Sequence, residues 1–401
     1  MRPEKILTDL FVKKFSKWGV TLTEAQKSDI KAQLQKDHIE EFSIIVTDAQ
    51  AEQIKNAGYD PQKLNLDFTD FDKDKFDQKF TNVITETITK LARTFGKEIF
   101  KNWKNQANLT LKNERKISIE VNRQIKKQWA KPLKNLEMLL SISRQLGSEF
   151  NIYLISNKAK ENDLVLEVLT RSHGRACQVG YEILTLLSNG FADGGYARWR
   201  TLHEITVISA FIAQHNNELA QRYLDHTVIT NFHEAEAYQK NCKSLSLIPI
   251  SDEEIEFLKA NREKALKRYG LEFDKDYGWA SIVLDKPLTF AHIEEEVNLD
   301  HLRLFYKTAN VNIHAGSKGI LFRLGSQNNS NMILAGPSIF GLYEVGRRTA
   351  YSIALITSIV LLSKPNLDRL GYVSAIEKLR DEACWAFDKA EASFENKGNN
   401  S

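Results

Sequence analysis

Apolar residues recur three and four positions apart along almost the whole chain, which is the spacing of one buried helix face. Thr23 with Gln26 and Ser251 with Glu254 form capping-box patterns that predict helix starts. The sequence therefore predicts an all-α protein, a multi-helix bundle. We expect the longer helices at residues 76–106, 116–146, 161–188, 194–214, 218–243, 252–269, 290–297, 299–313, 338–362 and 375–394.

A few segments depart from this pattern. Residues 39–46 (IEEFSIIV) are compatible with a short strand or with the extension of a helix. Residues 315–337 contain four glycines and a polar tract, with apolar segments on both sides, so we expect a short β-hairpin-like insertion near residues 320–336. The polar end, residues 396–401, is expected to be a disordered tail.

Charge is distributed unevenly along the 401 residues. The stretch from Lys90 to Lys134 holds thirteen Lys and Arg but three Asp and Glu, whereas the whole chain has a net charge of +3. Trp103 and Trp129 lie within this basic stretch. The asymmetry predicts a basic helical N-terminal region at residues 1–150 and a helical core domain at residues 151–395. Lysine-rich helices are also commonly no more than solvated faces.

Composition narrows the class of protein. With 42% hydrophobic and 27% charged residues, the chain is typical of a globular protein. Its three cysteines lie far apart, which gives no disulfide framework, and the start of the chain has no export signal, so we expect a cytoplasmic protein. The most apolar run, Ala350 to Leu362, is shorter than the ~20 residues that a bilayer requires, so it predicts a buried core helix and no membrane partner.

Candidate chemistry begins with two charged residues on an apolar helix. Arg200 and Glu204 are four residues apart and therefore project from the same face. An isolated charge at such a position costs several kcal/mol, so we expect the two to pair with each other or with further polar groups. Such a pair either fixes the register of two helices or serves a functional site.

A histidine on the same helix adds a group that can change charge near neutral pH. Arg198 and His203 have the Arg-x4-His spacing and resemble the arrangement of metal-independent ribonucleases of the HEPN superfamily. That resemblance implies an arginine that steadies the phosphate and a histidine that moves protons during attack by the 2′-hydroxyl. Trp199 stands directly after the arginine, where those enzymes often have a polar residue.

A second polar cluster follows about a hundred residues later. Tyr306, Asn310 and His314 recur at intervals of four and form one row. If that row faces Arg200 and Glu204, the two clusters form one pocket. Alternatively, His314 caps the end of its helix and satisfies free carbonyl groups.

These motifs together resemble a family of uncharacterised bacterial helical proteins, some of which are associated with phage defence or toxins. The resemblance covers roughly residues 160–365. It is carried by Arg200-x3-Glu204, by the loop Asp276-Tyr-Gly-Trp279, and by Tyr306 with His314-x-Gly316. It implies that Arg200, Glu204, Trp279, Tyr306 and His314 are functional residues, and it implies no established reaction.

We therefore expect an effector that acts on RNA, a defence-associated or toxin-like protein and a candidate metal-independent ribonuclease that needs no metal or cofactor. Basic residues such as Lys126 and Lys127 would hold phosphates. Arg200, Arg198, Glu204, His203 and His314 are the candidate catalytic residues, and Tyr306, Asn310 and Trp279 would contact substrate. The rival hypothesis is a non-catalytic interaction module whose N-terminal helices bind a partner protein or nucleic acid. A third possibility is a sensor of a small molecule or nucleotide. The sequence does not indicate an oligomeric state.

Overall fold

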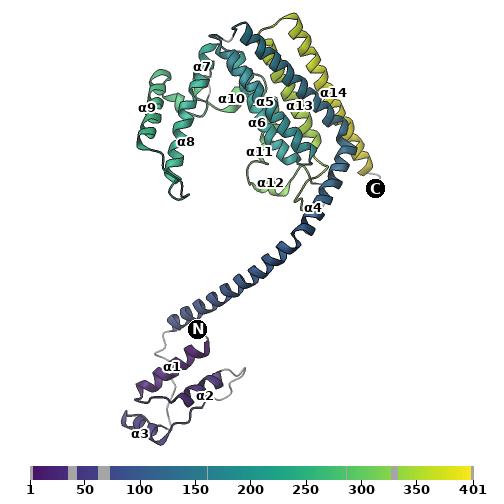
Figure 1. Ribbon diagram of the computed structural model, residues 1–401. Helices are drawn as coiled ribbons and strands as arrows, with labels where there is room; N and C mark the ends of the chain where they lie inside the picture. Colours follow the sequence, from purple (N-terminus) through teal and green to yellow (C-terminus); the bar gives the residue numbers. More distant parts are fainter. Residues whose placement is uncertain are drawn as a thin grey trace. The chain divides into compact units, whose positions relative to one another are not determined.

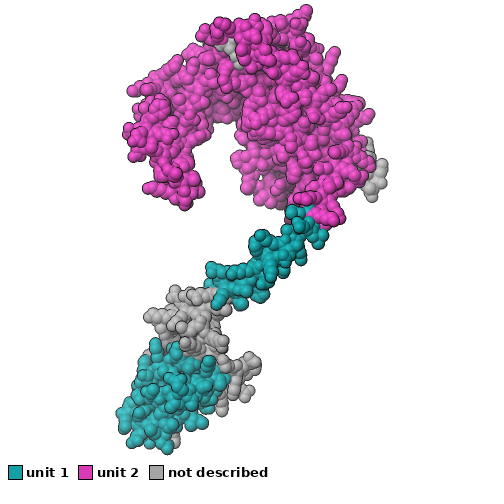
Figure 2. Space-filling view, in the orientation of Figure 1, with its two compact units in different colours: residues 1–111 teal, residues 112–401 magenta. Residues whose placement is uncertain are grey.

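The computed structural model describes residues 3–34, 43–61, 73–159, 161–285, 287–326 and 333–398. These ranges consist of helices joined by turns, so the prediction of an all-α, multi-helix protein is confirmed (Figure 1). The chain divides into two compact units, residues 1–111 and residues 112–401 (Figure 2).

Unit 1 begins with three short helices, α1 (Pro3–Lys17), α2 (Glu24–Leu34) and α3 (Asp48–Asn56). The predicted capping box starts α2, because the backbone N–H of Gln26 donates to the hydroxyl of Thr23 at 3.3 Å and the backbone N–H of Thr23 donates to Gln26 at 2.9 Å. These helices enclose a small apolar core. Its buried members are Phe11, Phe15, Trp18, Val20, Leu22, Ile30 and Ile54.

The helix α4 (Lys73–Ser156) runs for 84 residues, from unit 1 into unit 2. The expectation of two separate helices at residues 76–106 and 116–146 is wrong. Residues 107–115 contain no glycine or proline, so nothing in the backbone stops the helix between them.

From the sequence, Gly147 and Ser148 are expected to end the first half of the chain, but both lie inside α4. A Cβ at this position would lie 2.3 Å from Cε1 of His173, which is on α5 (Leu164–Ser188). Gly147 therefore lets α4 approach α5 closely. The predicted boundary near residue 150 falls within this continuous helix.

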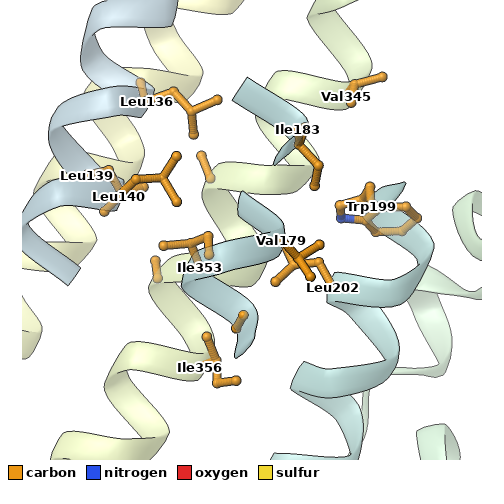
Figure 3. Packing of buried hydrophobic residues seen from close by; sticks show 14 of the residues in the cluster. Leu136, Leu139, Leu140, Val179, Ile183, Trp199, Leu202, Val345, Ile353 and Ile356 are labelled. Atoms are coloured by element: carbon orange, nitrogen blue, oxygen red, sulfur yellow. The ribbon is translucent and has the colours of Figure 1, made fainter. Parts of the chain in front are cut away.

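The main core of unit 2 lies between the later part of α4 and four further helices: α5, α6 (Ala192–Ala213), α13 (Leu342–Leu362) and α14 (Leu367–Gly398). Figure 3 shows how side chains from α4, α5, α6 and α13 pack against one another. Burial of such side chains is the main favourable contribution to folding. The residues labelled in Figure 3 are Leu136, Leu139, Leu140, Val179, Ile183, Trp199, Leu202, Val345, Ile353 and Ile356.

A second apolar cluster joins the C-terminal half of α6 to a series of shorter helices. Ser251 is the N-cap of α9, as its capping box predicted, and its hydroxyl accepts from the backbone N–H of Glu254 at 3.2 Å. The shorter helices are α7 (Asn217–Asp225), α8 (Thr227–Asn241), α9 (Asp252–Tyr269), η1 (Leu271–Asp274), η2 (Gly278–Ile282), α10 (Phe290–Glu296), η3 (Asp300–Leu302), α11 (Arg303–Asn310) and α12 (Ser317–Leu321).

The predicted β-hairpin-like insertion near residues 320–336 is wrong. In the described ranges no strand occurs, and residues 317–321 form α12. The backbone that a hairpin would pair is bound elsewhere: the Asp193 carboxylate accepts from the N–H of Leu324 at 2.9 Å, and the N–H of Ser338 donates to the Gly190 carbonyl at 2.9 Å. Residues 327–332 lie outside the described residues.

Two smaller expectations concern the ends of elements. The predicted disordered tail at residues 396–401 is wrong for residues 396–398, which continue α14, and residues 399–401 lie outside the described residues. Of the possible strand at residues 39–46, residues 39–42 lie outside the described residues. Residues 43–46 belong to no helix or strand.

The apolar run at Ala350 to Leu362 lies in α13, which by length and composition alone is apolar enough to cross a membrane. Within the structure 61% of its apolar window is buried, and α13 contributes Val345, Ile353 and Ile356 to the main core. The expectation of a buried core helix is confirmed.

Candidate functional site

The site is built on α6, which packs between the two apolar clusters. Residues four apart on a helix share a face. Trp199 and His203 therefore share one face of α6, and Arg200 and Glu204 share the neighbouring face. The two faces have different hydrogen-bond partners on α10 and α11, whereas the Tyr306 ring contacts both faces and lies 5.8 Å from the His203 ring.

Arg200, Glu204 and Tyr306 form a closed polar cluster. A nitrogen of Arg200 (Nη2) lies 2.9 Å from Oε1 of Glu204, and it also donates to the Tyr306 hydroxyl at 2.6 Å. The Tyr306 hydroxyl donates in turn to Glu204 at 2.5 Å. The structure thus brings together three residues that the sequence analysis had singled out, and they join α6 to α11.

The phenol of Tyr306 is the centre of this cluster. Burial, together with its hydrogen bond to Glu204, raises the pKa of Tyr306, so it stays protonated and remains a donor. The guanidinium of Arg200 lies 4.8 Å from the centre of the Tyr306 ring, a cation–π contact. These contacts involve Nη2 of Arg200, Oε1 of Glu204 and the Tyr306 hydroxyl, whereas the buried Nε of Arg200 has no hydrogen-bond partner among the described residues.

His203 belongs to a separate, more deeply buried group. Its Nε2 lies 2.8 Å from Oε1 of Glu294 on α10, and both side chains are almost fully buried. Arg303 donates to the second oxygen of Glu294. The imidazole also stacks on Trp199, with ring centres 5.2 Å apart. The carboxylate therefore fixes the orientation of the imidazole and stays neutralised by Arg303.

The partner of His203 also determines which ring nitrogen can react. A carboxylate accepts hydrogen bonds, so in the neutral imidazole Nε2 carries the proton and Nδ1 holds a free lone pair. Among the described residues no group forms a hydrogen bond with Nδ1. The pair can therefore act as an oriented general base.

Sequence analysis missed Glu294, although the sequence contains a signal. Phe290, Ile293 and Glu294 are the buried residues of α10 and lie three and four positions apart. Glu294 thus stands on the apolar face of its helix, whereas Glu295 and Glu296 point to solvent. A carboxylate on an apolar face indicates a buried partner.

His203 lines a cavity of about 430 Å³ that is enclosed by α6, the η3–α11 segment, α13 and α14. Ligand sites commonly have volumes of 300–1,000 Å³. Arg347, Arg348 and Arg380 line the same cavity, with Glu377 as the carboxylate among its lining residues. The cavity therefore presents guanidinium donors that can bind an anion.

Carboxylates outside the cavity hold these three arginines in place. The pairs are Arg347 with Asp388 at 3.3 Å, Arg348 with Glu344 at 3.2 Å, and Arg380 with Asp381 at 2.8 Å. The guanidinium of Arg348 also lies on the Phe305 ring, 3.2 Å from its centre. Arginines oriented in this way present fixed donors to a phosphate.

Several predicted site residues lie apart from this cavity. Arg198 donates to Glu182 on α5. Arg198 and His203 are five positions apart on α6 and therefore lie on different faces of that helix, so their side chains do not converge. Trp279 is buried in the second apolar cluster against Phe211 and Tyr223, where it has no surface for substrate.

The remaining candidates occupy the surface or its edge. His314 is exposed in a turn, four residues beyond the end of α11 at Asn310. The side-chain oxygen of Asn310 is buried and has no hydrogen-bond partner in the described part of the chain. Lys126 and Lys127 are exposed on α4.

The two tryptophans of the basic stretch have different roles. Trp129 is fully buried in the main core, 6.1 Å from the Phe387 ring, and its indole N–H donates to the carbonyl of Ile339 at 2.9 Å. Trp103 is 70% exposed. Among the described residues no group of three His, Cys, Asp or Glu side chains is arranged to hold a metal ion.

The fold and the site together define an all-helical protein with a histidine–carboxylate pair at an arginine-lined cavity. Residues 166–332 match the model of a family of unknown function, DUF5677. This confirms, for that segment, the resemblance to an uncharacterised helical family. No curated protein and no solved structure matches the chain. The matched segment contains His203, Glu294 and Arg303, whereas the three cavity arginines follow it.

Proposed function

We propose that this protein is a ribonuclease that cleaves RNA without a metal ion, with His203 as its general base. The observation that carries the proposal is the His203–Glu294 pair at the wall of an arginine-lined cavity. A role as a defence-associated or toxin-like effector rests on the sequence resemblance, and it is consistent with such an activity.

The residues suit cleavage by the 2′-hydroxyl of the RNA itself. Nδ1 of His203 takes the proton of the 2′-hydroxyl while its oxygen forms a bond to phosphorus, and the bond from phosphorus to the 5′ oxygen breaks. His301 lines the same cavity and is the candidate acid that protonates the leaving oxygen. The products are a 2′,3′-cyclic phosphate and a free 5′-hydroxyl.

The arginines supply the electrostatic part of this reaction. Negative charge grows on the phosphate oxygens as the new bond forms. Fixed guanidinium groups therefore stabilise the transition state more than the ground state. Arg347 and Arg348 stand on one turn of α13 and Arg380 on α14, so the cavity presents donors from two helices. In this proposal the three arginines have the phosphate-binding role that the resemblance to HEPN ribonucleases implied for Arg198.

The Arg200–Glu204–Tyr306 cluster then has a positioning role. It fastens α11 to α6, and α11 carries Arg303, which neutralises Glu294. The basic surface of α4, including Lys126 and Lys127, would hold the rest of the RNA by its phosphates. Binding of this kind weakens steeply as salt concentration rises.

The test is cleavage of a short, random-sequence, single-stranded RNA by the full chain in excess EDTA, with mass spectrometry of the product ends. We expect cyclic-phosphate ends from the wild type. His203→Asn should lower the rate about 10²–10⁴-fold, the usual contribution of a general base. His314→Ala is the matched control, since its imidazole lies outside the cavity, and it should keep full activity.

Because His203 is buried, His203→Asn is compared with Arg380→Gln, which changes a partly exposed cavity residue. Both variants are checked for wild-type helicity by circular dichroism. A wild type that cleaves no RNA overturns the proposal and favours the non-catalytic interaction module. Full activity in a folded His203→Asn protein, or its loss in His314→Ala, overturns the assignment of the base.

A further inference from the structure

The segment of α4 from Ile88 to Trp103 carries an apolar stripe with no covering partner in the described residues. All residues of α4 from 88 to 106 are exposed to solvent. Large apolar side chains recur three or four positions apart and are between 46% and 70% exposed. They are Ile88, Leu91, Phe95, Ile99 and Trp103, here named the apolar stripe.

The stripe lies on one side of the helix. At 100° per residue its five members fall within a sector of about 120°, the width of a helix face that normally packs against protein. At a rise of 1.5 Å per residue it is about 24 Å long. A contiguous exposed apolar surface of this kind marks an interaction site.

The basic residues of the same segment occupy the opposite side. They fall within a sector of about 80° that is centred on the back of the helix. These residues are Lys90, Arg93, Lys97, Lys101 and Lys104. The acidic residue of the segment is Glu98, at one edge of the stripe.

This distribution of charge favours one kind of binding partner for the apolar stripe over two others. A helix that lies in an anionic bilayer binds more tightly when its cations contact the lipid headgroups. With the stripe in the acyl layer, the five cations of this segment would point away from the headgroups. An acidic partner helix would need cations beside the stripe, where Thr89, Gly96 and Asn105 stand instead. The charged residue beside the stripe is Glu98, so two identical helices can approach without repulsion between cations.

We propose that the apolar stripe of α4 binds the same stripe of a second copy of this chain. Pairing two stripes removes ten large apolar side chains from water and leaves both basic faces on the outside. The association is independent of the proposed ribonuclease activity, since the stripe lies in unit 1 and the cavity in unit 2.

The experiment measures the mass of the full chain in solution. Sedimentation equilibrium should give about twice the 45.9 kDa of one chain. Phe95→Glu places a charge in the interface, so we expect the dimer dissociation constant to rise at least about 100-fold. Lys97→Glu, on the opposite face, is the matched control and should leave the dimer intact. Neither side chain is in a core, so folding is preserved.

Cross-linking then shows which surface is in contact. The native cysteines at positions 177, 242 and 384 are buried, so a cysteine at position 95 reacts selectively. Phe95→Cys should form a cross-linked dimer with a short bismaleimide, and Lys97→Cys should not. A monomeric wild type, or a dimer that survives Phe95→Glu, overturns the proposal. The proposal is also overturned if the protein is a monomer that co-sediments with phosphatidylglycerol vesicles and Phe95→Glu abolishes this co-sedimentation.

Discussion

His173 should make the stability of this protein depend on pH in a defined window. The imidazole is buried where α4, α5 and α13 meet, and its Nε2 lies 3.1 Å from the hydroxyl of Thr357. That hydroxyl already donates to the carbonyl of Ile353, so it accepts from a neutral imidazole. Burial lowers the pKa of His173 from 6.5 to about 4.

The sign and size of the effect follow from linkage. Below pH 6.5 the unfolded chain binds a proton at this histidine, whereas the folded chain does not until about pH 4. Stability is therefore fully present above pH 6.5 and is lost as pH falls toward 4. At 1.36 kcal/mol per pH unit, the loss from this single residue is about 3 kcal/mol.

The assay is urea unfolding, followed by circular dichroism, from neutral pH down to pH 4. Other groups titrate in this range, so the quantity of interest is the difference between the wild type and His173→Gln, which cannot ionise. The wild type should lose about 3 kcal/mol more than this variant over the window. His314→Gln, which changes an exposed imidazole, is the control and should follow the wild type. Parallel curves for wild type and His173→Gln would refute the reasoning.

Two further predictions concern packing and the polar cluster. Gly346→Ala should destabilise the fold by about 1–3 kcal/mol, because its Cβ would lie 2.1 Å from the buried Phe387 ring. In Gly174→Ala on α5 the new Cβ meets nothing within 4 Å, so this variant should stabilise the fold by about 0.5–1 kcal/mol. Equal shifts in the melting temperature of the two variants would contradict this prediction. Tyr306→Phe should cost about 1–2 kcal/mol in thermal unfolding, since it removes hydrogen bonds to Arg200 and Glu204, and an unchanged midpoint would show these bonds contribute nothing.

Local patterns were sufficient to predict the helices and part of the polar cluster. The capping boxes at Thr23 and Ser251 mark real helix starts, because the signal and its hydrogen bonds lie within three residues. Arg200 and Glu204 pair as their spacing predicts. Ser374 and Glu377 form the same pattern, which predicts that the last helix starts at residue 375. That prediction is wrong, since α14 begins at Leu367 and Ser374 lies inside it.

Features that depend on contacts between distant segments were not predictable in this way. His203 and Glu294 are 91 positions apart, and nothing in either neighbourhood specifies the other. The cavity needs α13 and α14 to deliver Arg348 and Arg380 beside α6. Glycine at position 147 is required because a side chain there would collide with the ring of His173 on another helix. That contact is not evident from the local sequence, in which a glycine is typical of a helix end.

The residues that line the cavity come from two stretches of the chain. The imidazole and its carboxylate come from the stretch that matches the family, residues 166–332, while every arginine of the cavity comes from beyond it. A chain with only the matched stretch would therefore contain His203 and Glu294 without these arginines. An exchange of α13 and α14 would change the arginines of the cavity and leave the hydrogen bond between His203 and Glu294 in place.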